Sequence, residues 1–183
     1  AESIIDNAYS KINFNEKIVD IKSFGNVSFL ELFHGPTLAF KDMALTVLPH
    51  LMVESKKTLK YPKKTLILTA TSGDTGKAAL AGFADVPGTK IIVFYPKNGV
   101  SPIQEKQMVT QKGDNTYVVG IHGNFDDAQT GVKNIFGNEA LNAELDAAGF
   151  QFSSANSINI GRLVPQIVYY VYAYTRLLAN GEI

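Results

Sequence analysis

The sequence contains no cysteine, which excludes disulfide bonds, thiolate metal sites and a cysteine nucleophile. A cysteine-free chain fits a reducing compartment, and we expect a cytoplasmic protein. An excess of charge of one sign is also missing, because 17 basic residues balance 17 acidic ones. Proteins that bind nucleic acid or an anionic membrane carry a positive electrostatic footprint, so we expect neither partner.

Long apolar runs are missing as well. No stretch approaches the roughly 18 consecutive apolar residues of a membrane span, and the late apolar segment 163–178 is interrupted by Pro165 and Arg176. The opening residues, "AESIIDNAYSKINF", lack the basic start and apolar core of a signal peptide. The sequence starts without methionine and ends on "NGEI" directly after a helical pattern, so we expect a piece of a longer protein.

The residues that are present predict a globular α/β domain. The 183 residues are 45% hydrophobic, enough to bury a core. Short apolar runs predict strands buried on both faces, and helical spacing fills the intervals between them. The expected strands cover 65–71, 90–96, 115–121 and 150–155, and the expected helices cover 74–83, 102–111, 126–136 and 138–148. This alternation predicts an open, doubly wound, mostly parallel sheet of about four strands.

Ligands of such sheets bind at the carboxyl ends of the strands, so the loops there are candidate sites. The segment "TATSGDTGKAAL" (69–80) has two glycines and several small hydroxyl residues between a strand and a helix. Backbone N–H groups exposed at a helix start suit a phosphate or carboxylate. A plain strand-to-helix turn, with Asp74 or Thr75 as N-cap, is equally open. The segment fits neither the P-loop nor the dinucleotide glycine fingerprint.

A second loop, "NSINIGRLVPQ" (156–166), brings Asn156, Ser157 and Arg162 together near a predicted strand end. A guanidinium binds phosphate bidentately, so an anion clamp is one interpretation. The spacing alone favours a plainer one, in which Asn156 or Ser157 caps a helix and Arg162 lies on a solvated face.

The segment "ELFHGPTLAFKDMAL" (31–45) places Lys41 at a predicted helix start. A cation there faces the positive end of the helix dipole, so Lys41 either points into water or does not act as a cation.

The remaining candidate groups carry weaker signals. His34, His50 and His122 lack the spacing of metal ligands, and we expect no metal site. A late stripe of tyrosines is expected to pack rather than to bind a cofactor; its members are Tyr169, Tyr170, Tyr172 and Tyr174.

Four ordered segments resemble threonine synthase, a pyridoxal-phosphate enzyme of the fold type II (tryptophan-synthase-like) group. They are "LELFHGPTLAFKDMAL", "TATSGDTGKAAL", "YPKNGVSPIQEKQM" and "NSINIGRLVPQ". The resemblance implies a lyase that converts O-phospho-L-homoserine and water to L-threonine and phosphate in threonine biosynthesis. The alternatives are another fold type II lyase, such as a hydroxy-amino-acid dehydratase or a phospholyase-like enzyme, and a non-catalytic α/β module that binds an anion.

The resemblance also implies roles for individual residues. Lys41 carries pyridoxal 5'-phosphate covalently and moves protons on the substrate, and Phe40 and Asp74 contact the cofactor. The implied substrate-binding residues are Ser72, Gly73, Asp74 and Thr75 for the carboxylate, and Thr75, Asn156, Ser157 and Arg162 for the phosphate. Many fold type II relatives have asparagine where Asp74 stands, and an aspartate donates a hydrogen bond only when it is protonated.

The family's domain plan assigns 41–158 to a small α/β domain, and 1–40 and 159–183 to pieces of a larger one. The glycine-rich loop that grips the cofactor phosphate lies in a part of the family that this sequence does not contain. We therefore expect residues 1–183 alone to fold, to be catalytically inactive and to self-associate through uncovered surfaces that include the helix 163–178.

Overall fold

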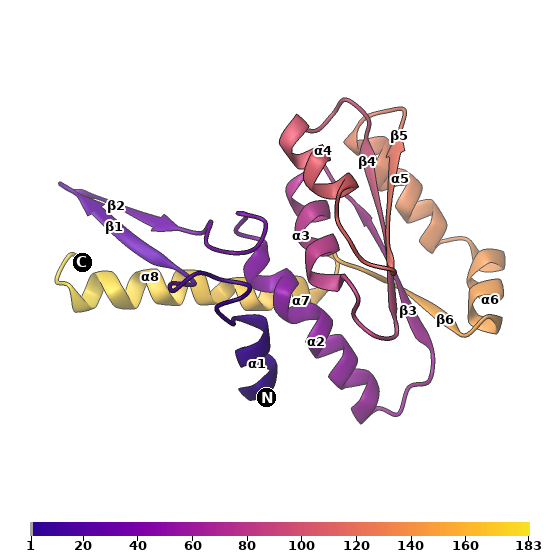
Figure 1. Cartoon of the computed structure of the whole chain (residues 1–183), viewed down its shortest axis with the longest axis horizontal. Helices are drawn as coiled ribbons and strands as arrows, with labels where there is room; N and C mark the ends of the chain where they lie inside the picture. Colours follow the sequence, from indigo (N-terminus) through magenta and orange to yellow (C-terminus); the bar gives the residue numbers. More distant parts are fainter. Residues whose placement is uncertain (1) are drawn as a thin grey trace.

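A four-stranded parallel sheet forms the centre of the computed structural model, which describes residues 2–183 (Figure 1). Its strands are β3 (Lys64–Ala70), β4 (Thr89–Pro96), β5 (Thr116–Ile121) and β6 (Phe150–Ser154). The spatial order is β5-β4-β3-β6, and every neighbouring pair is parallel. The predicted strands and their parallel arrangement are confirmed. Because β6 crosses back to lie beside β3, the winding reverses between these two strands.

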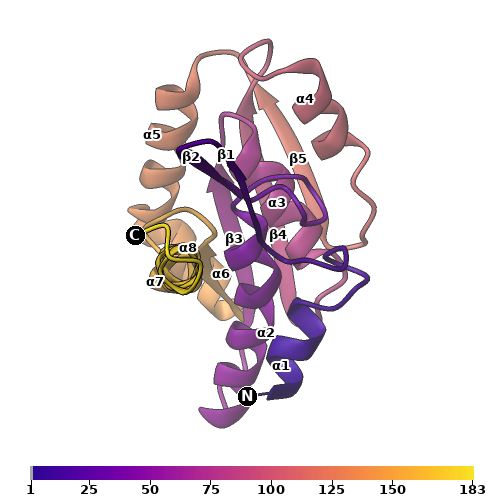
Figure 2. The same ribbon diagram turned by 90° about the vertical axis from the view of Figure 1, so that its left-hand side faces the viewer.

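Helices cover both faces of the sheet, as a doubly wound fold requires (Figure 2). One face carries α2 (Asp42–Thr58), α3 (Asp74–Phe83) and α4 (Pro102–Val109), and the other carries α5 (Phe125–Phe136) and α6 (Glu139–Ala147). The core on the first face includes Leu45, Ile67, Leu80, Phe83 and Met108, and the core on the second includes Leu68, Ala70, Ala128 and Val132. Strands buried on both sides explain the nearly continuous apolar runs in the sequence.

Local signals fix the starts of two of these helices. Ser101 and Gln104 form a capping box at the start of α4, with Pro102 in the first turn. Asn124 and Asp127 form another at the start of α5. Each box satisfies the N–H groups of its N-cap residue and of the third helical residue with a nearby side chain.

The chain ends form a second group of elements beside the sheet. This group contains α1 (Glu2–Ala8), β1 (Asp20–Phe24), β2 (Val27–Glu31), α7 (Ile160–Leu163), the 3₁₀ turn η1 (Val164–Gln166) and α8 (Ile167–Ala179). The antiparallel β1–β2 hairpin and α8 extend away from the sheet together (Figure 1). The Glu182 carboxylate, just after α8, accepts hydrogen bonds from the hydroxyls of Ser23 (3.0 Å) and Ser28 (2.8 Å) in the hairpin.

The single helix expected over 163–178 is wrong at its start. Helical structure already begins at Ile160, and η1 separates α7 from α8. Pro165 lies in η1 and has no N–H to donate, which favours a short, tighter turn at this point. Within residues 2–183, no helix has the length and apolarity to cross a membrane.

We predict that Leu80→Ala lowers the free energy of unfolding by about 2–5 kcal/mol, because Leu80 is fully buried between α3 and the sheet and the truncation leaves a cavity. Urea denaturation measures the loss. The control is Ile103→Ala on α4, where the side chain is 74% exposed and the change is expected to stay within about 0.5 kcal/mol. Equal losses in the two variants would contradict the assigned core.

Candidate functional site

The two polar loops meet where the winding of the sheet reverses. Asn156 follows β6, and its carboxamide bonds both backbone groups of Ala70 at the end of β3. The Oδ1 atom accepts from the Ala70 N–H at 3.1 Å, and Nδ2 donates to the Ala70 carbonyl at 2.9 Å. Asn159, rather than Asn156 or Ser157, caps α7, so the capping prediction for this loop is wrong. The loops therefore share the position at which doubly wound sheets bind ligands.

The start of α3 has no side-chain cap, and the prediction of Asp74 or Thr75 as N-cap is wrong, because the N-cap residue is Gly73. Instead, the Thr71 hydroxyl oxygen accepts from the N–H groups of Gly73 (3.0 Å) and Gly76 (2.8 Å). The N–H groups of Asp74 and Thr75 have no hydrogen-bond partner in the part of the chain that the structure describes. Two donors at a helix N-terminus are thus free for an anion.

Gly73 is required in this loop for two reasons. Its φ is 137°, a conformation that side chains with a Cβ rarely adopt, and a Cβ there would lie 2.4 Å from the Gln104 side chain. The exposed Ser72 precedes it. The glycine lets α4 approach the start of α3 closely.

Lys41 lies at the N-cap position of α2, as the sequence predicts. Its side chain is 20% exposed, and its Nζ lies 3.9 Å from Asp74 Oδ2 and 4.4 Å from the centre of the Phe40 ring. Burial lowers the pKa of Lys41; the Asp74 carboxylate opposes this shift, and the charges of Arg162 and Lys77 add to it. The lysine at the helix start therefore has more of the character of a neutral amine than a lysine in water.

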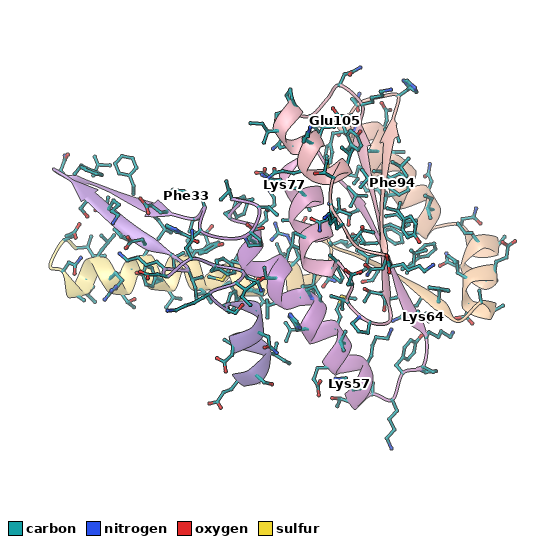
Figure 3. All side chains as sticks on the ribbon, viewed as in Figure 1. Phe33, Lys57, Lys64, Lys77, Phe94 and Glu105 are labelled. Carbon is teal, nitrogen blue, oxygen red and sulfur yellow. The ribbon has the colours of Figure 1, made fainter. Side chains whose placement is uncertain are left out.

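Asp74 is a carboxylate shared between several donors. Gln104 Nε2 donates to its Oδ1 at 2.9 Å, and Lys77 Nζ lies 3.1 Å from the same atom. Partial burial works to raise the pKa of Asp74, but hydrogen bonds from Gln104 and Lys77 and the charges of Lys77 and Lys41 outweigh it and lower the pKa. Lys77 is labelled on α3 in Figure 3 and is buried. It obtains its counter-charge from Asp74. An ionised Asp74 accepts hydrogen bonds and does not donate them.

Arg162 on α7 is only 5% exposed, so the solvated-face interpretation is wrong. Its Nη1 donates to the Gln166 side chain. Its Nε, fully buried, finds no hydrogen-bond partner among residues 2–183. Burial lowers the pKa of the guanidinium. A buried guanidinium with an unused donor is suited to an oxyanion.

Comparison with known proteins identifies relatives along nearly the whole chain, although no protein-family model matches it. The protein "Threonine synthase-like 1" of Homo sapiens is 40% identical over 188 aligned positions, which cover 98% of this chain and 25% of that protein. Threonine synthase of Pseudomonas aeruginosa is 43% identical over 84% of this chain and 31% of its own length. The chain belongs to the threonine synthase family.

The fold leads to the same family. The solved structure of pyridoxal-phosphate-bound threonine synthase from Brucella melitensis matches with a TM-score of 0.82 and 37% identity, over 96% of this chain and 36% of that one. Diaminopropionate ammonia lyase from Escherichia coli shares the fold at 14% identity and a TM-score of 0.52. The chain spans about a quarter to a third of the length of the threonine synthases that it matches.

Sequence reasoning missed two groups of this threonine synthase segment. Lys77 stands three residues after Asp74, a helical spacing that brings opposite charges together and could have revealed the pair. Gln104 lies on another helix, α4, and no local sequence pattern predicts its contact with Asp74. Residues 2–183 contain no group of three or more histidine, aspartate or glutamate side chains placed to hold a metal ion.

We predict that Asp74→Asn lowers the pKa of the Lys41 amine further, because the carboxylate favours the charged amine and its removal favours the neutral one. Acetylation of Lys41 across a pH series, followed by peptide mass mapping, measures the shift. The control is Asp146→Asn, which removes the partner of the distant Lys63. That variant should lower the pKa of Lys63 alone. An unchanged or raised Lys41 pKa in Asp74→Asn would count against the site geometry.

Proposed function

We propose that the chain supplies the lysine-bearing part of a threonine synthase active site. The reaction is the pyridoxal-phosphate-dependent conversion of O-phospho-L-homoserine and water to L-threonine and phosphate in threonine biosynthesis, and its compartment is the cytoplasm. The observation that carries this proposal is a partly buried lysine of lowered pKa beside Asp74, at the reversal point of a doubly wound sheet. The identity to threonine synthases supports it.

The residues present fit pyridoxal phosphate. Lys41 offers a primary amine that is more often neutral than an ordinary lysine, which is the state in which an amine attacks an aldehyde. The Phe40 ring, 40% exposed beside that amine, offers an apolar surface for the cofactor. When bound, the cofactor supplies an electron sink for the negative charge that develops on the substrate.

Lys41 has two tasks in this proposal. Its Nζ would hold the cofactor, and the amine would take and return protons at the substrate carbons. Asp74 holds a compensating negative charge for Lys41 and Lys77. Because the pKa of Asp74 is lowered, we propose that it serves the cofactor site as a charge partner rather than as a hydrogen-bond donor.

The free N–H groups of Asp74 and Thr75 at the start of α3 bind the substrate carboxylate in this arrangement, together with the exposed Ser72, and Gly73 shapes the loop that presents them. The phosphate is bound by Thr75, Asn156, Ser157 and Arg162. Asn156 keeps one amide hydrogen for this purpose, since Nδ2 carries two and the Ala70 carbonyl uses one. The unpaired Nε of Arg162 supplies a charged donor.

The alternatives from the sequence have less support. A hydroxy-amino-acid dehydratase has no phosphate to be bound by a buried arginine with an unpaired donor, and a non-catalytic module has no use for a lysine of lowered pKa. Activity toward phosphohomoserine, compared with free threonine or serine, separates the enzymes.

We also propose that residues 41–158 form the small α/β domain and that residues 1–40 and 159–183 belong to a larger domain. Self-association of the chain is part of the same proposal. Its candidate surface is the apolar face of α8 and η1, where exposed side chains line a groove: Val164, Ile167, Val168 and Val171.

We predict that pyridoxal phosphate attaches covalently to Lys41, since its amine has the lowered pKa. Borohydride reduction and peptide mapping should place the label there, and Lys41→Ala should abolish it. Label on Lys77 or Lys97 instead would overturn the assignment. The same 183-residue chain should release no phosphate from phosphohomoserine, because positioning errors of the kind expected without the rest of the active site can cost about a hundredfold.

We predict that Arg162→Ala in the full-length protein lowers kcat/KM for phosphohomoserine roughly ten- to a hundredfold, the effect of losing a charge-assisted hydrogen bond of about 1.5–3 kcal/mol. Cofactor retention, followed by absorbance, should change little. The matched control is Arg176→Ala, since Arg176 is an exposed arginine on α8. Unchanged kcat/KM in Arg162→Ala would remove Arg162 from the phosphate site.

A further inference from the structure

Two tyrosines from opposite ends of the chain hold the backbone on either side of Lys41. The Tyr9 hydroxyl, just after α1, donates to the carbonyl of Met43 at 2.7 Å. The Tyr169 hydroxyl, on α8, donates to the carbonyl of Phe40. The lysine thus lies between two carbonyls that are each fixed by a phenol.

The bond from Tyr169 is the more consequential of the two. The backbone N–H groups of Ala44 and Leu45 both turn to the Lys41 carbonyl. The Phe40 carbonyl consequently receives no backbone donor within the described chain, and Tyr169 is its partner. Without that hydroxyl, this carbonyl would lose its hydrogen bond next to the lysine.

The other side of the same segment is held by Asp42. Its carboxylate accepts from the Thr37 N–H (2.9 Å), the Thr37 hydroxyl (2.6 Å) and the Ala39 N–H (3.3 Å). The turn passes so close that a Cβ on Gly35 would lie 2.5 Å from the Asp42 Cβ. Asp42 therefore holds the segment that precedes Lys41. Tyr9 and Tyr169 hold the carbonyls of Met43 and Phe40 on either side of the lysine.

The setting of these phenols differs from that of the neighbouring tyrosines. Tyr169 is 5% exposed, whereas Tyr170 and Tyr174 on the same helix are 77% and 60% exposed. Tyr169 packs as expected, whereas Tyr170 and Tyr174 lie on the part of the helix 163–178 that was expected to be uncovered in this chain. Burial raises the pKa of Tyr9 to about 12 and raises that of Tyr169 as well, so both phenols stay protonated donors at working pH.

We propose that Tyr9 and Tyr169 are positioning residues that hold Lys41 in its partly buried place through their bonds to the Met43 and Phe40 carbonyls. Both phenols act through the backbone, and the proposal does not require either of them to contact the Lys41 amine. The proposal rests on the proposed role of Lys41. It makes the reactivity of that lysine depend on how α1 and α8 pack against the start of α2.

The test uses Tyr9→Phe and Tyr169→Phe in the 183-residue chain, each of which removes one hydroxyl and keeps the ring. Tyr170→Phe is the control on the same helix. Competitive acetylation across a pH series measures the pKa of the Lys41 amine in the native protein. A second readout is the rate at which pyridoxal phosphate attaches to Lys41, trapped with borohydride. Urea unfolding reports the stability of each variant.

We expect the Lys41 pKa to rise toward that of an ordinary lysine in both phenylalanine variants, because a loosened segment exposes the amine. The rate of attachment at neutral pH should fall about three- to tenfold, and Tyr170→Phe should match the parent chain. A lower stability with unchanged Lys41 pKa and rate would overturn the proposal and leave the tyrosines a structural role. Loss of folding in both variants would overturn it equally, and if only one folds, that one decides.

The two proposals can fail separately. If the parent chain attaches no pyridoxal phosphate at Lys41, the proposed function fails. The pKa comparison of the Lys41 amine still decides the role of the tyrosines, because it needs no cofactor.

Discussion

The Asn156 carboxamide bonds both polar groups of Ala70 at the point where β6 lies beside β3. This pair of bonds extends the strand pairing by one side chain beyond the end of β6, and it joins loops that are far apart in the sequence. The buried Ser154 hydroxyl, which donates to the Leu68 carbonyl at 3.0 Å, strengthens the same junction. The junction places both α3 and α7. The first begins at Asp74, shortly after Ala70, and the second begins at Ile160, shortly after Asn156, and carries Arg162.

The junction gathers positive charge in a chain that has no net charge. Lys77 and Arg162 lie close enough to Lys41 for their charges to lower its pKa, and the Asp74 carboxylate opposes them. Asp42, whose carboxylate interacts with the charge of Lys77, is a second acidic group, so three basic groups outnumber two acidic ones and the site is short of negative charge. Partial burial strengthens the field of these groups, so an anion is favoured there although the whole molecule is neutral.

The sequence was informative wherever the deciding interaction is local. Strand and helix periodicity predicted the sheet, and Lys41 was placed correctly at its helix start, because these features depend on residues within one element. The caps near residues 74 and 156 were predicted wrongly for a different reason. Asn156 uses its side chain for the backbone of Ala70, 86 positions away, and Thr71 serves the start of α3 from a position before the N-cap residue, so the usual capping statistics did not apply.

The burial of Arg162 escaped prediction because it depends on how α7 packs against distant parts of the chain. The β1–β2 hairpin was also missed. Its burial pattern is mostly exposed, so its sequence carries little of the alternation that marks a half-buried strand.

The Tyr169 hydroxyl bond to Phe40 joins residues 129 positions apart. Ribosomal synthesis delivers the lysine segment well before Tyr169, and closing so long a loop costs chain entropy before its contacts form. The amine therefore reaches its sheltered setting late in folding. Before α8 docks, Lys41 lacks the Tyr169 contact beside it and is closer to an ordinary ammonium; docking of α8 completes the setting that lowers its pKa.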